Sequence, residues 1–314
     1  MTSRDTPPSD QIGEATPLTA EIEDREPPRS LTSEAWRDLR RKPLFWVAIT
    51  LIVLFVVMAV APQVFTDKDP TEAMLDKSMT PPSADQWFGR DLQGYDIYAR
   101  TVYGARASIL VGLLATICTS VVGVIVGTAA AYRGGVWDAI VMRITDVFFA
   151  IPFLLGGILL MTTFPNDVNS SFFSVIGKVV IALAVLGWPG IARLIRGSVL
   201  QVLPNDYVQA ARALGASPWR IIRSHILPNA VGPVIVVATI NLGAYIAAEA
   251  TLSFLGIGLV SPAISWGVAI SDSLDYIRVA PYMLMFPSLF LSLAVLAFIM
   301  LGDTVRDAFD PKTR

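Results

Sequence analysis

Apolar and polar positions follow one another along this chain in long blocks, without the short period of a soluble amphipathic helix or strand. Six apolar runs lie at about residues 44–61, 108–131, 139–164, 172–193, 230–256 and 279–302. A helix needs roughly 20 consecutive, mostly apolar residues to cross a bilayer. The pattern therefore predicts an all-α polytopic membrane protein with six transmembrane helices.

Composition agrees with a bilayer protein, since 54% of the residues are hydrophobic and only 16% are charged. The single cysteine, Cys118, excludes an intramolecular disulfide and is expected to be a small buried apolar residue. The single histidine, His225, excludes a multi-histidine metal site. We therefore expect no metal.

The segments outside the apolar runs differ in character. The first 29 residues are rich in Pro, Ser, Thr, Asp and Glu, as in a disordered tail, and lack the apolar core of a signal peptide. Arg40, Arg41 and Lys42 end a short expected interfacial helix with its basic end on the cytoplasmic surface. The expected divisions are a tail at 1–29, an interfacial helix at 30–43, a first span at 44–61, an extracytoplasmic loop at 62–107, a core at 108–302 and a C-terminal tail at 303–314.

Two of the runs contain proline. Pro152 is expected to kink the third run, where Arg143 and Asp146 are spaced to pair on one helical face. The fourth run is interrupted by the segment Gly187-Trp188-Pro189-Gly190. Such an interruption is typical of a pathway or hinge in transporters, although a harmless kink is an equal alternative.

The fifth run contains two polar residues, Asn241 and Glu249, within about 80° of each other on a 3.6-residue helix. A carboxylate at a helix centre costs roughly 2.5–3.5 kcal/mol on insertion scales, so it usually faces a cavity or a partner. Asn241, Glu249, Trp188 and Pro189 are therefore the candidates for a translocation path or gate. Alternatively, Glu249 lies near the outer interface, where this cost is small.

Basic residues predict the orientation of the spans. With the N-terminus inside, 17 of the 24 Lys and Arg residues fall on the cytoplasmic side and 7 on the other. Both termini are therefore expected in the cytoplasm, together with the polar segment 205–229.

Segment 205–229 has a helix–break–helix pattern. Asp206 is expected to cap a first helix that runs to about Leu214, and Gly215 suits the position just past its end. Ser217 then resembles a second N-cap, with Pro218 at the first helical position.

The second helix of this segment is predicted to carry Trp219, Ile222 and Ile226 on one stripe, and Pro228 is expected to mark the join to the next span. A compact, partly apolar projection of this kind suits insertion into a partner's groove. The alternative is an ordinary amphipathic loop.

The pattern Gln209-Ala210-Ala211-x3-Gly215-x9-His225-Ile226-Leu227-Pro228 resembles the EAA loop of ABC-importer permeases. Gln209 replaces the first Glu of that consensus, and His225 matches the dipeptide/oligopeptide branch. In that family the loop forms coupling helices that dock into ATPase subunits. The resemblance implies the following coupling residues: Gln209, Ala210, Ala211, Leu214, Gly215, Ala216, Ser217, Pro218, Trp219, Leu227 and Pro228.

Other segments extend the resemblance to about residues 36–311. The extracytoplasmic loop carries a motif similar to that of peptide permeases, with Asp91, Gly94, Asp96 and Arg100. Residues 248–258, Ser265-Trp266-Gly267 and residues 301–311 are also similar to family elements. The chain thus resembles the C-type permease of dipeptide/oligopeptide importers.

This resemblance implies a type I ABC-importer permease fold with cytoplasmic coupling helices, in a bacterial inner or plasma membrane. The implied partners are a B-type permease in a heterodimer, two cytoplasmic ATPases, an extracytoplasmic substrate-binding protein, a peptide substrate and membrane lipid, with no nucleic acid. The chain has no G-x-x-x-x-G-K-[ST] phosphate loop, so ATP and Mg are expected in the ATPases and no cofactor in this chain.

Two alternative functions remain open at this point. A permease of the same family could carry nickel or another non-peptide solute. A remote alternative is an intramembrane enzyme, but His225 lies on a cytoplasmic segment, and the spans offer only Glu249 and the end-placed Asp146 as carboxylates.

Overall fold

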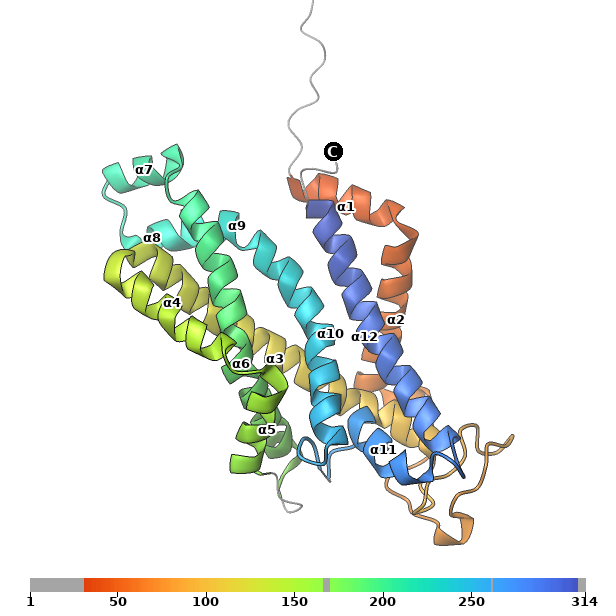
Figure 1. Ribbon diagram of the computed structural model, residues 1–314. Coiled ribbons are helices and arrows are strands. Elements are labelled where there is room, and N and C mark those ends of the chain that lie inside the picture. Colours follow the sequence, from red (N-terminus) through yellow and green to blue (C-terminus); the bar gives the residue numbers. More distant parts are fainter. Residues whose placement is uncertain (1–30, 166–169, 261, 310–314) are drawn as a thin grey trace, which may run out of the picture.

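The computed structural model describes residues 31–165, 170–260 and 262–309, and these residues are mostly helical (Figure 1). The predicted tail at 1–29 and the last residues, 310–314, lie outside the described ranges. The elements are α1 (Leu31–Arg41), α2 (Pro43–Val60), η1 (Pro62–Val64), η2 (Leu75–Lys77), α3 (Ile97–Arg133), α4 (Gly135–Phe149), α5 (Phe153–Thr163), α6 (Phe172–Val202), α7 (Asp206–Ala213), α8 (Pro218–Ile221), the π-helical turn η3 (Ile222–Ile226), α9 (Leu227–Ala230), α10 (Gly232–Phe254), α11 (Trp266–Ser273), η4 (Leu274–Tyr276) and α12 (Tyr282–Phe309).

Five of the described helices, α2, α3, α6, α10 and α12, are long and apolar enough to cross a membrane, and the pair α4 and α5 forms a sixth candidate. These two helices meet at 85°, so the expected kink at Pro152 is a complete break. Pro152 is the N-cap of α5 with ψ of 125°. Proline has no N–H to continue α4, and it disfavours helical geometry in the residue before it.

The second span begins earlier than the apolar pattern predicts. Helix α3 starts at Ile97 and not near Ser108, so the loop predicted at 62–107 ends at Asp96. The Asp96 side chain accepts a hydrogen bond from the backbone N–H of Ala99 at 3.0 Å and caps the helix. The hydropathy pattern missed this part of α3 because its polar residues interrupt the apolar run.

The fourth span is continuous, so its predicted interruption and its end near Arg193 are both wrong. Helix α6 passes through the buried Pro189 and ends at Val202. One missing backbone donor is tolerated inside a membrane helix where neighbouring groups compensate. The basic residues near its end are neutralised by carboxylates of α4, as described below.

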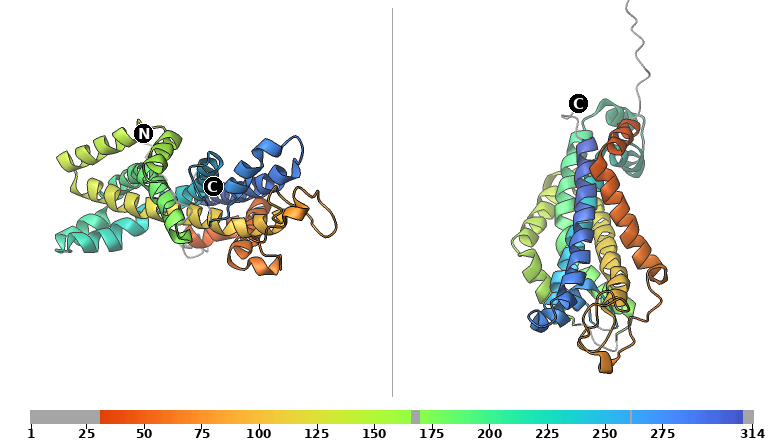
Figure 2. Two further views of the ribbon diagram at one scale, coloured as in Figure 1. Left: turned by 90° about the horizontal axis from the view of Figure 1, so that it is seen from below. Right: turned by 90° about the vertical axis from the view of Figure 1, so that its right-hand side faces the viewer.

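Close packing of α3 against α6 depends on small residues. A Cβ added at Gly123 would lie 2.6 Å from the Ile191 side chain, and one at Gly127 would lie 2.2 Å from the carbonyl oxygen of Ala192. Backbones that approach this closely gain van der Waals contact where no hydrophobic force drives association. Helix α10 packs beside α3 and α12, and α2 covers α3 and α12 on the other side (Figure 2).

Helices α1 and α12, the first and the last helices of the described residues, meet at one end of the bundle (Figure 1). Helix α1 lies across the ends of α2 and α12 (Figure 1), where Leu39, Phe45 and Ala308 form a small buried cluster. The Lys42 ammonium contacts the Asp307 carboxylate at 2.9 Å. The expected C-terminal tail therefore continues α12 as helix as far as Phe309.

Candidate functional site

A wide groove opens on one side of the bundle, between the broken pair α4 and α5 and the helices α6 and α10. Its volume is about 720 Å³. Aromatic rings form part of its wall, and glycine and small polar residues leave space between the helices. The groove is lined by Phe149, Phe153, Leu154, Leu186, Gly187, Gly190, Ile191, Leu194, Val237, Asn241, Ala244, Tyr245, Ala247, Ala248 and Thr251.

The four pathway candidates from the sequence have different positions. Asn241 lines the groove. Glu249 lies on the same helix but is fully buried between helices. Pro189 is buried in α6, and the Trp188 ring packs edge-to-face on Phe148, with centroids 5.5 Å apart. The flanking Gly187 and Gly190, which belong to the same Gly/Pro segment of the fourth run, border the groove instead.

Glu249 is buried near the end of α10, where its carboxyl group accepts a hydrogen bond. The Ser253 hydroxyl donates to Glu249 Oε1 at 2.8 Å, and the backbone N–H of Leu259 donates to Ser253 Oγ at 2.9 Å. Ser108 of α3 and Ser265 at the start of α11 also lie beside the carboxyl group. Ser253 is the hydrogen-bond partner of Oε1, and Oε2 has no partner within the described residues. Because the carboxyl group is fully buried between helices, its position fits a structural support better than direct contact with a solute.

The segment α7–α9 forms a projection at the opposite end of the bundle from α11 (Figure 1). Gly215 has φ of +77°, and Ser217 Oγ accepts from the Arg220 N–H at 3.4 Å, with Pro218 at the first helical position, as predicted. The prediction that Asp206 caps the first helix is wrong by one residue. Asn205 is the N-cap, with extended ψ of 143°, and Asp206 is the first helical residue.

The predicted apolar stripe of this segment is also wrong. Ile221 and Ile226 are buried against Val208, whereas Trp219 is 68% exposed. In the π-helical turn Ile222–Ile226 the backbone hydrogen bonds join residues five apart, not four apart as in an α-helix. The residues that share a face therefore differ from those predicted from α-helical spacing. Pro228 lies inside α9, and the join to α10 falls at Val231.

The coupling candidates divide into anchored and exposed residues. The Gln209 side chain donates to the carbonyl oxygen of Leu203 at 2.8 Å, which fixes α7 to the end of α6. The backbone N–H of Ala216 donates to the carbonyl oxygen of Ala211 at 3.1 Å and closes the turn. Leu214 is 88% exposed, which is costly for a leucine without a partner. Leu214 and Trp219 therefore give the projection an apolar exposed surface.

The loop motif before α3 is held together by its own charges. Asp91 contacts Arg100 at 3.3 Å and accepts from the Tyr95 N–H at 2.8 Å, while Asp96 contacts Lys68 at 2.6 Å. Gly94 has φ of +80°, and an added Cβ would overlap Met74. Burial raises the pKa of the Asp91 carboxyl group, and the Arg100 charge opposes this effect.

Two ion pairs that the sequence reading missed join α4 to α6. Arg196 binds Asp138 through two hydrogen bonds of 2.6 and 2.5 Å, and Arg193 contacts Asp146 at 2.7 Å. The predicted pair of Arg143 with Asp146 exists only at 3.5 Å on the surface. Arg193 and Asp146 lie 47 positions apart in the chain, and Arg196 and Asp138 lie 58 apart. The spacing along one helix therefore could not reveal these two pairs.

Comparison with known proteins identifies the family. Residues 120–314 match the family described as binding-protein-dependent transport system inner membrane component, and residues 30–82 match the N-terminal transmembrane domain of oligopeptide transport permease C. The chain belongs to this family of transport permeases. It is therefore a membrane component of a transport system and not an enzyme.

Relatives of this permease match along nearly its whole length. It is 41% identical over 291 residues to the dipeptide transport system permease protein DppC of Bacillus subtilis (strain 168), covering 92% of this chain and 88% of the relative. It is 38% identical to the oligopeptide transport system permease protein OppC of the same organism, covering 95% and 96%. A glutathione transport system permease protein GsiD of Escherichia coli O157:H7 is 36% identical, covering 90% of each chain.

A solved structure supports the fold. The permease superposes with a TM-score of 0.52 on a chain of the MetNI methionine ABC transporter in an inward-facing conformation, at 22% identity. The match covers 67% of this chain and 96% of the other. The permease therefore has the type I ABC-importer fold that the sequence predicted.

Proposed function

We propose that this permease is one of two membrane subunits of an ATP-driven importer of di- and oligopeptides. Relatives named for dipeptide and oligopeptide transport, at 41% and 38% identity over most of the chain, carry this proposal. The other membrane subunit is a B-type permease. The substrate class follows these relatives, and nickel or another solute is the less favoured alternative.

The groove between α4, α5, α6 and α10 is half of the translocation pathway in this proposal, with the partner permease closing its open side. Its glycine, Asn241 and Thr251 positions offer a small-residue, partly polar surface, and its aromatic residues offer apolar contact. Such a mixed lining suits short peptides, which combine polar backbones with varied side chains.

The projection α7–α9 is the contact with two cytoplasmic ATPase subunits, which bind ATP and Mg. Exposed Leu214 and Trp219 provide the kind of apolar anchors that dominate interface energies. Moving a two-state pathway from 1:99 to 99:1 requires about 5.5 kcal/mol of differential stabilisation, which nucleotide binding in the ATPases supplies. Gln209, anchored to Leu203, transmits this movement to α6.

The orientation follows from the location of the basic residues. The described ends of the chain and the projection α7–α9 share one end of the bundle, which we place in the cytoplasm of a bacterial inner or plasma membrane (Figure 1). The loop before α3 and helix α11 then face an extracytoplasmic substrate-binding protein. Membrane lipid surrounds the exposed apolar faces.

Uptake by the assembled system tests this function. The permease, its partner permease, the ATPases and the binding protein are reconstituted in proteoliposomes, and uptake of radiolabelled Ala-Ala is compared with uptake of labelled nickel. We expect peptide accumulation that requires ATP and Mg and no ATP-dependent nickel accumulation. Nickel uptake without peptide uptake, measured with an active ATPase, would reverse the choice of substrate.

A further inference from the structure

A second cavity, with a lining separate from that of the groove, lies at the α11 end of the bundle, opposite to α7 and α8 (Figure 1). Its volume is about 440 Å³, within the roughly 300–1,000 Å³ typical of small-molecule sites. The start of α3, the end of α10 and helix α11 enclose it together with the loop between α10 and α11. One wall is apolar, with Leu259, Val260, Ile264 and Val268.

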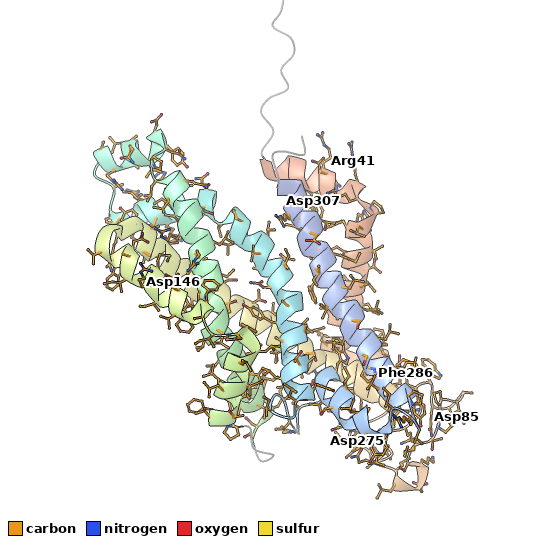
Figure 3. All side chains as sticks on the ribbon, in the orientation of Figure 1. Arg41, Asp85, Asp146, Asp275, Phe286 and Asp307 are labelled. Carbon is orange, nitrogen blue, oxygen red and sulfur yellow. The ribbon has the colours of Figure 1, made fainter. Side chains whose placement is uncertain are left out.

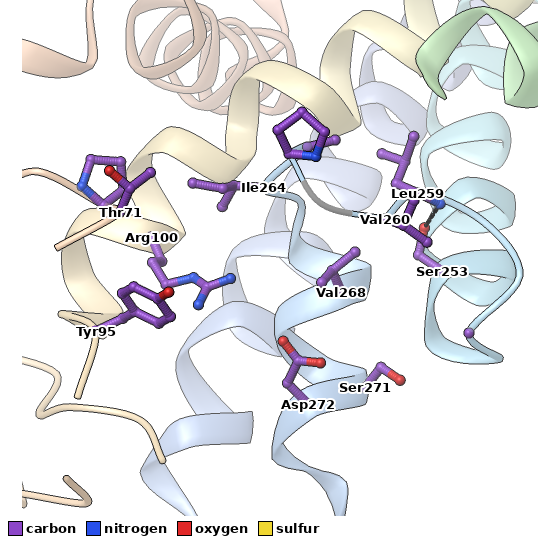
Figure 4. A pocket seen from close by; sticks show the side chains of 14 residues that line it. Thr71, Tyr95, Arg100, Ser253, Leu259, Val260, Ile264, Val268, Ser271 and Asp272 are labelled. Carbon is purple, nitrogen blue, oxygen red and sulfur yellow. Dashed lines mark hydrogen bonds between the residues drawn. The ribbon is translucent and has the colours of Figure 1, made fainter. Parts of the chain in front are cut away.

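Charged groups meet on the other side of this cavity. Arg100 of α3 and Asp272 of α11 extend toward the same space in Figure 4. Asp91 borders a small adjoining cavity that Arg100 and Asp272 also line. The cluster therefore holds two carboxyl groups and one guanidinium group, which leaves one negative charge uncompensated when both carboxyl groups are ionised.

The single cation of the cluster is already engaged. Arg100 contacts Asp91 at 3.3 Å, and its guanidinium lies 4.5 Å from the centre of the Tyr95 ring. Within the described residues, the Asp272 carboxyl group has neither a hydrogen bond nor an ion pair within 4.0 Å. The Asp272 residue is exposed overall, and partial desolvation of its carboxyl group raises its pKa while the Arg100 charge opposes the shift. An external cation would supply the missing partner.

The neighbouring hydroxyl group favours a ligand that donates hydrogen bonds. Ser271 also lines the cavity, and its hydroxyl group donates a hydrogen bond to the carbonyl oxygen of Phe254, with 2.9 Å between the two oxygens. Its remaining lone pairs can only accept. Asp272 and Ser271 thus place two acceptors side by side on α11, which suits an ammonium group with three N–H donors. No group of three or more metal-ligating side chains occurs in the described part of the chain, so a bare metal ion fits less well.

We propose that this cavity is an extracytoplasmic subsite that binds the N-terminal ammonium group of a short peptide at Asp272 and Ser271, with its first side chains on the wall formed by Leu259, Ile264 and Val268. The inference rests on the proposed peptide transport and deepens it, because it assigns a binding site to the permease itself. A peptide bound here is held at the outer end of the bundle before it enters the groove.

Equilibrium binding to the permease complex tests the subsite. The complex of both permeases and the ATPases, without the binding protein, is placed in lipid nanodiscs and titrated with radiolabelled Ala-Ala and with N-acetyl-Ala-Ala. In Asp272→Asn we expect the Kd for Ala-Ala to rise at least about tenfold, since a charge-assisted hydrogen bond is lost. Asp272→Glu keeps the carboxylate and should retain most of the affinity. Asp275→Asn is the matched control, because Asp275 is exposed on η4 outside the cavity lining.

Each result has a defined meaning. The subsite is supported if N-acetyl-Ala-Ala binds weakly to the wild-type complex and its Kd is the same for Asp272→Asn. That result would show that Asp272 recognises the ammonium group. Equal Kd values for wild type and Asp272→Asn, equal affinity for the acetylated peptide, or no detectable wild-type binding would each overturn the subsite. If the complete system still accumulates Ala-Ala in those cases, the proposed function survives. If it accumulates no peptide, both proposals fail.

Discussion

Trp219 and Ile221 lie two positions apart on α8 and face opposite environments. Ile221 is 1% exposed and packs with Val208 and Ile226, whereas Trp219 is 68% exposed. An indole held in solvent contributes little to the fold of the isolated chain, but it can bury a large area in a complex. The two residues therefore separate the proposed contact surface of the projection from the packed residues that support it.

Replacing these residues by alanine should have different consequences. Trp219→Ala should leave the thermal unfolding midpoint of the purified permease nearly unchanged and reduce the amount of ATPase that co-purifies. Ile221→Ala should lower stability by about 2–4 kcal/mol, because it opens a cavity in a packed cluster. Co-purification and thermal denaturation, measured on the same preparations, check both. Full ATPase recovery with Trp219→Ala would remove this residue from the contact surface.

Local chemistry made several residues of the projection predictable. Gly215, Ser217 and Pro218 follow rules that involve only neighbouring backbone groups, and the structure confirms all three. The apolar stripe was wrong because a π-helical turn changes the period of the face. The burial of Glu249 depends on Ser253 and on residues of other elements, which no local rule contains.

Helices α3 and α6 illustrate how small residues determine the packing of the bundle. Gly127→Ala should lower the thermal unfolding midpoint, since the added Cβ would lie 2.2 Å from the Ala192 carbonyl oxygen and force the helices apart. Overpacking of this kind costs about 1–3 kcal/mol. Gly197→Ala is the matched control, because its Cβ would meet no atom within 4 Å and should be neutral or slightly stabilising. An unchanged midpoint for Gly127→Ala would contradict the close approach.

The apolar runs predicted the membrane helices well and their ends less well. Hydropathy detects only the apolar part of a helix. It therefore missed the first turns of α3 and the last turns of α6, which contain polar residues. Proline was a weaker guide. Pro189 lies inside a continuous helix, whereas Pro152 separates two helices that meet at 85°. Tertiary contacts decide between these outcomes, and the sequence pattern is the same for both.

The complete molecule has two distinct ends. Figure 3 places Arg41 and Asp307 at one end and Asp85 and Asp275 at the other. Single cysteines at Ser83 and Ser217, both exposed, can be introduced in a Cys118→Ser background. A membrane-impermeant thiol reagent added to intact cells should label position 83 only. Labelling of position 217 from outside would contradict the proposed orientation.

The family was predictable from motifs, but the groove was not. The glycine, histidine and proline spacing of segment 205–229 resembles a coupling loop, and the family match agrees. The groove brings together residues of α4, α5, α6 and α10 that are about 100 positions apart in the chain. Of the pathway candidates named from polarity alone, only Asn241 is among its lining residues in the described structure.

Substitution at Gly215 tests most directly whether the projection α7–α9 couples this permease to its ATPases. Gly215 has φ of +77° and open space around its Cα, so a side chain there would point outward without an internal clash. Asp and Asn have nearly the same shape and both tolerate this region, with a backbone cost of at most about 1–2 kcal/mol. Gly215→Asp adds a charge that a docked interface would bury, and Gly215→Asn does not.

Permease level, ATPase co-purification and ATP-dependent peptide uptake should therefore be measured together for both variants. We expect normal membrane levels for each, with Gly215→Asp losing ATPase binding and uptake and Gly215→Asn retaining a substantial part of both. If Gly215→Asp keeps ATPase binding and uptake at wild-type values, the segment Asn205–Asn229 is not the coupling element.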